Sequence, residues 1–352
     1  MMNSGPFQAR QSTDLQPVHK DERLQCAWMA RSPWPAHASR ENNVPEQFEN
    51  PFTLEDLCVF DEEAWEHILC QNGLSIEQLA ESLRGASSKV VERIRQRLPQ
   101  EQRAAFENVL RNPEPNRNTE AARKEVLDYL FWELTYWLTP DFYDELTEGE
   151  RLHCGIFEQL EPDIRGGVIL DAGAGSGRAS FECVKYGAQR VYAVEPSPGL
   201  LRILRKKREQ QGEYERIVPT QGRFDALPLP DNSVDLTISC SAFTADSKQG
   251  GETGLAELKR VTRPGCKIVI IWPRPQDYDW LAEHGFRYVL LPVDGEMAVH
   301  FRSLRSAIRC AKRFYAHNGA VLRYIEQHHS PDVPFSVIGF NPPCDYCWLI
   351  VE

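Results

Sequence analysis

Residues 167–197 read GVILDAGAGSGRASFECVKYGAQRVYAVEPS, and this stretch decides the fold. The apolar run VILD leads into a loop with three alternating glycines. An amphipathic segment begins near Arg178, and a second apolar run, RVYAVEP, follows it. A strand, a glycine turn, a helix and another strand in this order are typical of a parallel βαβ unit. Ligands of such sheets bind at the carboxyl ends of the strands, so the glycine loop and the ends of both strands mark a candidate site.

The same alternation of apolar runs and amphipathic segments continues through residues 139–352. The apolar runs after RVYAVEP are RIVPTQG, VDLTISCSA and CKIVIIWP, and the helical segments between them include LLRILRKKREQQG and ETGLAELKRVTRPG. Strands that alternate with helices of this length predict a parallel, doubly wound α/β sheet with helices on both faces. Residues 276–346 are expected to complete the sheet and to cover the acceptor side of the site.

The loop does not have the residues that a phosphate-binding turn requires. A P-loop has Lys followed by Ser or Thr after its second glycine, and no such pair follows Gly177. A dinucleotide loop reads G-x-G-x-x-G, but the sixth position counted from Gly173 is Arg178. The glycine spacing alone therefore leaves the ligand open.

Two carboxylates restrict the ligand further. Asp171 ends the run VILD, where a carboxylate favours a positively charged ligand and disfavours a pyrophosphate. S-adenosyl-L-methionine (SAM) carries an ammonium and a sulfonium and has no phosphate. Glu195 ends RVYAVEP, where a carboxylate can accept hydrogen bonds from both hydroxyls of a ribose. Dinucleotide enzymes also use an acid there, so Glu195 indicates a ribosyl cofactor and Asp171 favours SAM.

Four segments in this order resemble class I SAM-dependent methyltransferases of the type 11 family: DAGAGSG, YAVEPS, GRFDALPLPDNSVDLTIS and LAELKRVTRPGCKIVI. The resemblance covers residues 145–275 approximately. It implies a Rossmann-like, seven-stranded methyltransferase sheet with SAM as cofactor and a small-molecule acceptor. The cofactor-binding residues that we expect are Asp171, Gly173, Gly175, Gly177, Glu195, Pro196, Phe224, Asp225 and Ser241.

The sequence departs from the family at the end of the third strand. The family usually has an acid directly after the glycine there, and this acid meets the adenine amino group. Here Gly222 is followed by Arg223 and Phe224, with Asp225 one position later. Either Asp225 takes the role through a different loop path, or Phe224 supplies stacking and the adenine is read less strictly. We favour Asp225 near the adenine.

Methyl transfer needs no strongly marked catalytic residue, because positioning and exclusion of water can supply most of the rate. A general base would help with a phenol, an alcohol or an acidic carbon. The residues expected to border the pocket are Tyr143, His153, Ser241, Phe243 and Asp246. None of them is marked as a base by its context, so the catalytic residue stays unassigned.

Residues 49–138 have the pattern of several short amphipathic helices, and Ser75 and Gln78 have the spacing of a capping box. The segment 52–135 resembles the C-terminal helical domain of the flagellar rotor switch protein FliG. LAESLRGAS, residues 79–87, corresponds to that family's "LA.ALKGAS" run, with Arg84 in place of its lysine. The resemblance implies a protein-interaction module and not membership of a flagellar motor. Residues 1–48 read as a disordered leader.

Charge and cysteine usage exclude several classes of partner. A net charge of −11 argues against nucleic-acid and anionic-membrane binding. The basic run 202–209 lies in an amphipathic segment and is expected to form a solvated helix face. Ten mostly isolated cysteines without an apolar targeting segment indicate the reducing cytoplasm. The CDYC segment, residues 344–347, has no second ligand pair, so no metal site is expected.

The preferred interpretation is a cytoplasmic SAM-dependent methyltransferase with an N-terminal helical interaction domain. An alternative is a degenerate SAM-binding domain that acts as a scaffold or sensor in a protein assembly. An oxidoreductase of the Rossmann type is the third hypothesis.

Overall fold

The computed structural model describes residues 50–352 except for 72, 113–117 and 212–214, so the predicted leader of residues 1–48 lies outside the described residues. The second part of the chain is built on a seven-stranded sheet with the order β3-β2-β1-β4-β5-β9-β6. Its strands are β1 (Val168–Ala172), β2 (Arg190–Glu195), β3 (Ile217–Gln221), β4 (Val234–Cys240), β5 (Thr262–Ile271), β6 (Arg287–Leu290) and β9 (Asp345–Ile350).

The sheet confirms the doubly wound α/β prediction and corrects one detail of it. Neighbouring strands from β3 to β5 pair in parallel, whereas β9 runs antiparallel to both β5 and β6. The sheet is therefore mixed and not fully parallel. After β6 the chain leaves the sheet and returns beside the end of β5, where Tyr346 at the start of β9 pairs with Ile271. Because β9 begins where β5 ends, the two strands run in opposite directions.

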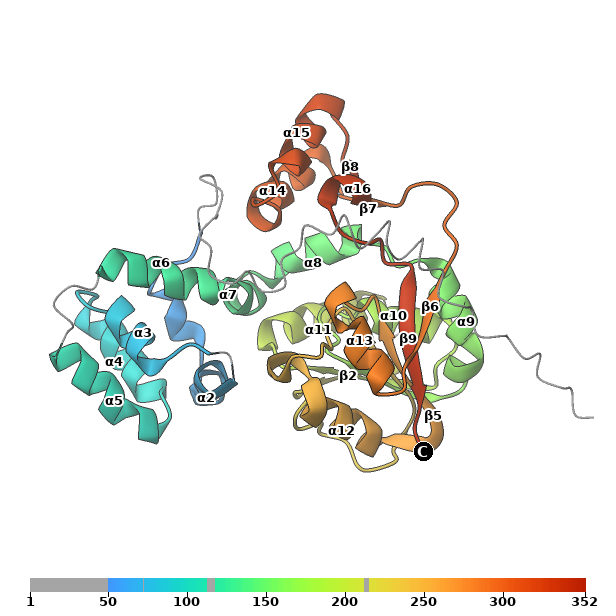
Figure 1. Ribbon diagram of the computed structural model, residues 1–352, viewed down its shortest axis with the longest axis horizontal. Helices are drawn as coiled ribbons and strands as arrows, with labels where there is room; N and C mark the ends of the chain where they lie inside the picture. Colours follow the sequence, from blue (N-terminus) through green and yellow to red (C-terminus); the bar gives the residue numbers. More distant parts are fainter. Residues whose placement is uncertain (1–49, 72, 113–117, 212–214) are drawn as a thin grey trace, which may run out of the picture.

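Helices cover both faces of this sheet (Figure 1). The hydrophobic cluster on one face joins the strands to helices α9, α10 and α11, and the cluster on the other face joins them to α12 and α13. The bounds of these helices are α9 (Cys154–Ile164), α10 (Arg178–Lys185), α11 (Pro198–Gln211), α12 (Gly251–Val261) and α13 (Tyr278–Glu283), with the short helices η2 (Ser247–Gln249) and η3 (Pro275–Asp277). Helix α10 begins at Arg178, as the sequence predicts.

In the residues that the structure describes, the N-terminal part consists of helices joined by short loops. Its elements are η1 (Asp56–Val59), α2 (Glu62–Gln71), α3 (Ile76–Ser82), α4 (Ser88–Arg97), α5 (Gln100–Arg111), α6 (Thr119–Tyr129) and α7 (Phe131–Leu138), and α8 (Pro140–Gly149) leads to the sheet. Ser75 and Gln78 form the predicted capping box at the start of α3. Trp65, Ile94 and Phe106 are fully buried between these helices, so their apolar faces build one core.

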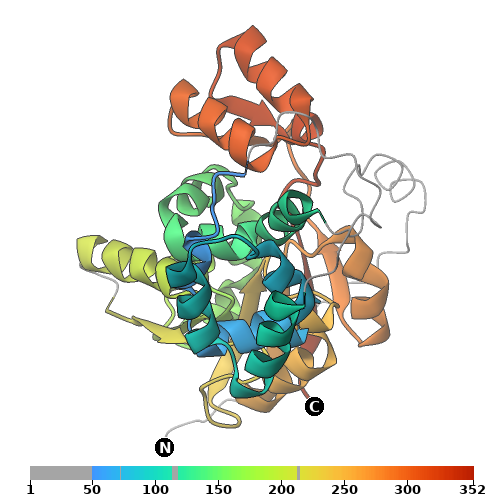
Figure 2. The same ribbon diagram turned by 90° about the vertical axis from the view of Figure 1, so that its left-hand side faces the viewer.

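A small lobe is inserted between β6 and β9. It consists of β7 (Ala298–His300), α14 (Leu304–Phe314), α15 (Gly319–His328), β8 (Asp332–Pro334) and α16 (Phe335–Ile338). Its buried side chains belong to the same hydrophobic cluster as those of α7 and α8, and Trp132 of α7 stacks on Phe314 of α14 at 5.5 Å between ring centroids. Figure 2 shows the lobe above the helical part and the sheet. The lobe therefore packs on the N-terminal helices and lies beside the start of β9.

Helix α11 carries the basic run 202–209. Leu201 and Leu204 are buried against the sheet, while Arg202 and Arg205 are exposed, as the predicted amphipathic pattern requires. One basic residue behaves differently, because the ammonium of Lys207 forms an ion pair with Asp144 of α8. This part of the run therefore contributes to packing within the chain.

Candidate active site

The glycine loop between β1 and α10 adopts a backbone that side chains disfavour. Gly173, Gly175 and Gly177 have φ angles of 73°, 56° and 97°. A Cβ atom on Gly177 would lie 2.4 Å from the Leu204 side chain, so this glycine allows α10 to enter close to α11. Gly173 and Gly175 remain partly exposed, so the backbone of the loop is open to a ligand.

Asp171 is the second-to-last residue of β1, just before this loop. Its side chain is almost completely buried, and its Oδ2 accepts a hydrogen bond of 2.5 Å from the hydroxyl of Ser180. Its Oδ1 has no partner. Burial raises the pKa of the carboxyl to about 6. A buried carboxylate oxygen without a partner is costly, so the site favours a donor or a cation that would satisfy it.

Glu195 ends β2 beside the loop. One of its carboxyl oxygens accepts the N–H of Gly175 and the other accepts the N–H of Ser197, both at 2.9 Å. Burial raises the pKa of this carboxyl to about 7. The two backbone donors fix the orientation of the carboxylate, and each oxygen retains capacity for a further hydrogen bond. Pro196, which follows, is exposed at the same edge.

In the segment after β3, the side chain of Phe224 lies toward the glycine loop, whereas that of Asp225 forms an ion pair with Arg223. The ring of Phe224 lies against the glycine loop, since its Cζ would be 3.1 Å from a Cβ on Gly173. Asp225 turns toward Arg223, whose Nε donates to its Oδ1 at 3.1 Å. The guanidinium of Arg223 also contacts the imidazole of His67 in the helical domain. Phe224 therefore joins the site, whereas the Asp225 carboxylate is engaged by a neighbouring cation.

Ser241 follows β4 with a φ of 56°. Its hydroxyl accepts a hydrogen bond from Nη2 of Arg178 at 3.1 Å. Arg178 also donates to the backbone oxygen of Glu150 at 3.0 Å and lies 5.7 Å from the ring centroid of Trp272. In the sequence, Arg178 marks the start of a helix and a departure from the dinucleotide-loop pattern, and neither feature indicates a role in the site. The structure shows instead that its guanidinium crosses to the end of β4, which makes it a candidate ligand for an anionic group.

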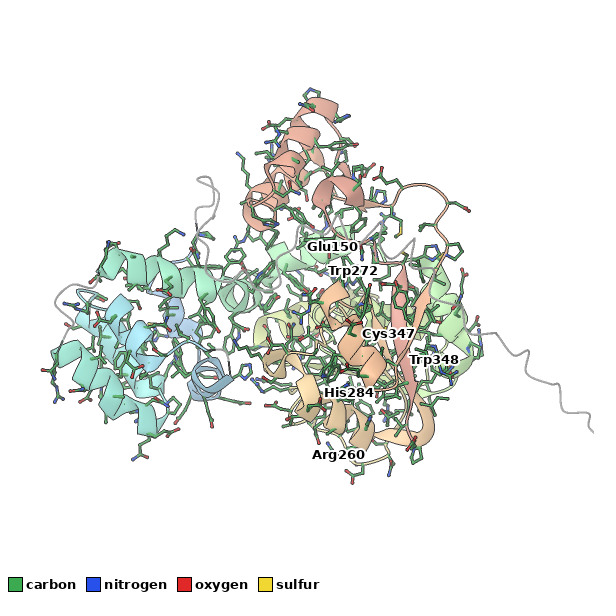
Figure 3. All side chains as sticks on the ribbon, viewed as in Figure 1. Glu150, Arg260, Trp272, His284, Cys347 and Trp348 are labelled. Carbon is green, nitrogen blue, oxygen red and sulfur yellow. The ribbon has the colours of Figure 1, made fainter. Side chains whose placement is uncertain are left out.

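Aromatic and acidic residues cover the loop from α7, α8 and the lobe. The ring of Tyr143 would lie 3.9 Å from a Cβ on Gly175 and packs edge-on against Tyr136 at 4.8 Å between centroids. Glu150 lies 3.7 Å from Arg178 and accepts a hydrogen bond of 3.1 Å from the hydroxyl of Tyr315. Burial raises the pKa of the Glu150 carboxyl. Figure 3 shows Glu150 and Trp272 between the lobe and the sheet.

The other candidates from the sequence have structural roles. His153 caps α9, since its Nδ1 accepts the N–H of Gly155 at 3.2 Å. Asp246 caps η2 by accepting the N–H of Lys248 at 3.0 Å. Phe243 is buried and packs edge-on against Phe224 at 5.5 Å between centroids. Of the five residues that were expected to border the pocket, Tyr143 and Ser241 are thus the two that adjoin the glycine loop and Arg178.

Cys344 and Cys347 are both buried at β9, which begins at Asp345. Within the described part of the chain, no cluster of three or more His, Cys, Asp or Glu side chains has the arrangement of a metal site. The helices that the structure describes include none that is long and apolar enough to span a membrane.

Residues 169–265 match a family described as methyltransferase domain. This segment runs from β1 into β5 and contains the glycine loop, Glu195 and Ser241. The segment is similar to methyltransferase domains, and the cofactor that this similarity implies is SAM.

Curated relatives match over the same part of the chain. The ubiquinone/menaquinone biosynthesis C-methyltransferase UbiE of Enterobacter sp. (strain 638) is 30% identical over 41% of this chain and 60% of its own length. The malonyl-[acyl-carrier protein] O-methyltransferase of Methylococcus capsulatus is 35% identical over 34% of this chain and 41% of its own length. The chain thus spans about half the length of the curated relatives it matches.

Among solved structures, a SAM-dependent methyltransferase from Aquifex aeolicus is 22% identical with a TM-score of 0.33. The match covers 41% of this chain and 83% of that one.

Proposed function

We propose that this protein is a cytoplasmic methyltransferase that binds SAM at the glycine loop and transfers a methyl group to a small molecule. The observation that carries the proposal is the buried Asp171, whose Oδ1 has no partner, beside a loop of three glycines with positive φ. The expected cofactor residues Asp171, Glu195, Phe224 and Ser241 all lie at the ends of β1 to β4.

The residues of the site fit SAM in charge. Asp171 offers an unsatisfied carboxylate oxygen to a cation, and Glu195 offers an oriented carboxylate to ribose hydroxyls. Arg178 is placed for the carboxylate of the methionine portion, because its guanidinium reaches from the glycine loop to Ser241. When bound, SAM supplies an electrophilic methyl group. The protein's residues orient the cofactor and exclude water from it.

The acceptor site belongs, in this proposal, to the surface between Trp272, Tyr143 and the lobe. Trp272 directly follows β5 and has a φ of 54°, an uncommon backbone conformation for a residue other than glycine. Its indole N–H donates to the backbone oxygen of Asn341, which fixes the ring below the lobe. In this proposal residues 276–346 cover the acceptor side of the site.

Calorimetry with SAM, S-adenosylhomocysteine and NAD tests the proposal. We expect micromolar binding of the first two and none of the third, and binding of NAD alone would refute it. Methyl transfer from labelled SAM to a metabolite mixture tests the activity. Tight SAM binding without transfer to any acceptor would favour the scaffold or sensor alternative.

We also propose that residues 49–138, which resemble the FliG helical domain, bind a protein partner. The run LRGAS borders a surface hollow of about 360 Å³. Its lining residues are Leu83, Arg84, Gly85, Ala86, Ser88, Val91, Glu92 and Leu110. A pull-down with the full chain and with its Val91→Asp variant tests this. A partner retained equally by both proteins would place the contact elsewhere, and no partner for either would remove the proposal.

A further inference from the structure

The adenine amino group of SAM lacks an available acid on the segment that normally provides one. Asp225 is the only acid between Gly222 and Leu227, and its carboxylate is held by Arg223. Arg223 is itself held from the other side by His67 of α2. This chain of contacts directs the Asp225 carboxylate toward Arg223. An amino group that enters here therefore needs an acceptor from another element.

Helix α7 of the helical domain lies against the neighbouring turn between β2 and α11. The hydroxyl of Ser197 donates a hydrogen bond of 3.0 Å to the backbone oxygen of Tyr136. The approach is close, since a Cβ on Gly199 would lie only 2.1 Å from that same oxygen. Glu133 precedes Tyr136 by one helical turn, so the two residues share a face of α7. Glu133 is thereby placed near the turn that carries Glu195.

Glu133 is a half-buried acid without a partner. No residue that the structure describes forms a hydrogen bond or an ion pair with its carboxylate. Burial raises the pKa of Glu133, and the charge of Arg223 lowers it. Burial raises the pKa of Glu195, the two backbone hydrogen bonds lower it in part, and the charge of Glu133 raises it again. Glu133 therefore lies within electrostatic reach of both the ribose acid and the segment after β3.

We propose that Glu133 accepts a hydrogen bond from the 6-amino group of the adenine of SAM, in the role that the displaced Asp225 leaves open. The proposal rests on the proposed function, because it assumes that SAM occupies the site between Glu195 and Phe224. An unpartnered, half-buried carboxylate gains a donor in this way, and the amino group gains its acceptor.

A consequence concerns the role of the helical domain. Two of its helices act on the adenine end of the site, since His67 of α2 contacts Arg223 and the charge of Arg223 acts on Glu133 of α7. The helical domain thus completes the cofactor site of the methyltransferase domain. Binding of the adenosine portion stabilises the contact between the two domains.

The test compares two ligands by calorimetry with the full chain: S-adenosylhomocysteine and its analogue with hydrogen in place of the 6-amino group. The wild-type protein is expected to bind the analogue about 10- to 100-fold more weakly, because a hydrogen bond to a charged acceptor is lost. Glu133→Ala should reduce this difference to about threefold or less. Glu133→Gln retains an acceptor oxygen and should give an intermediate value. Asp225→Asn is the matched control and should keep the wild-type difference.

Several results would overturn the proposal. One is a wild-type protein that binds both ligands equally, and another is a Glu133→Ala variant that still discriminates fully. Loss of discrimination in Asp225→Asn alone would assign the amino group to Asp225. Failure of the proposed function has a different signature, because then neither ligand binds to the wild-type protein. Circular dichroism of each variant separates these outcomes from unfolding.

Discussion

The hydroxyl of Ser197 and the backbone oxygen of Tyr136 form a hydrogen bond of 3.0 Å that joins the turn after β2 to helix α7 of the N-terminal helical part. Ser197 lies two residues after Glu195 and donates its own N–H to the Glu195 carboxylate. The residue that orients the candidate ribose acid therefore also binds helix α7. Helix α7 is joined in this way to the candidate cofactor site.

Gly199→Ala should separate the two domains. The added Cβ would lie 2.1 Å from the backbone oxygen of Tyr136 and 2.8 Å from that of Trp137, and neither carbonyl can move without moving α7. Overpacking of this kind costs about 1–3 kcal/mol of the free energy of unfolding. Hydrogen exchange should show faster exchange of the α7 amides. Gly319→Ala is the control, since its nearest neighbour is the flexible end of Arg323. Unchanged exchange in α7 would show that the contact is not required.

Asp171→Asn should weaken cofactor binding without lowering the stability of the protein. The substitution keeps a side chain that can accept the hydrogen bond from Ser180, and it removes a buried charge whose Oδ1 lacks a partner. We expect an unchanged or higher melting temperature without ligand. SAM affinity should fall at least about tenfold, because a charge-assisted interaction is lost. An affinity equal to that of the wild-type protein would mean that the glycine loop is misassigned.

The free energy of unfolding without ligand should fall as the pH rises from about 4.5 to about 7. The folded-state pKa values of Asp171 and Glu195 are raised to about 6 and about 7, so the folded state holds protons that the unfolded chain releases. Glu195 alone contributes on the order of 3 kcal/mol to this change. Urea denaturation at several pH values measures it. A free energy of unfolding that rises across this window would contradict the assignment.

SAM affinity should increase over the same pH range. The ionised form of Asp171 attracts the cationic cofactor, and ionised Glu195 accepts both ribose hydroxyls. Affinity at pH 7.5 is therefore expected to exceed that at pH 5.5 by about tenfold. Calorimetry in buffers of different ionisation enthalpy should also show proton release on binding near pH 6.5. Proton uptake would indicate that other groups control binding.

Arg178→Lys tests the methionine end of the site. A lysine keeps the charge but lacks the planar set of donors that reaches both Ser241 and Glu150. SAM should bind about tenfold more weakly. Methylthioadenosine, which has no carboxylate, should bind as it does to the wild-type protein. Equal weakening of both ligands would assign Arg178 a structural role only.

The resemblance and local patterns predicted the central part of the fold and the position of the candidate site within it. The run VILD, the glycine loop and the helix from Arg178 follow from short-range spacing, so Asp171 and Glu195 fall at the ends of β1 and β2 as expected. The direction of β9 was not predictable in this way. It depends on the lobe of residues 298–338, which returns the chain at the carboxyl edge of the sheet.

The sequence by itself determined where β1 and β2 end and that a glycine loop follows β1, because these features depend on neighbouring residues in the chain. Only the tertiary structure decided that Arg178 crosses to Ser241, 63 positions away, and that Arg223 engages Asp225 while His67 holds it. It also placed Tyr136 of α7 on Ser197, 61 positions along the chain. Such contacts come from the packing of whole helices, and no periodicity in the sequence encodes which face of α7 meets which turn of the sheet.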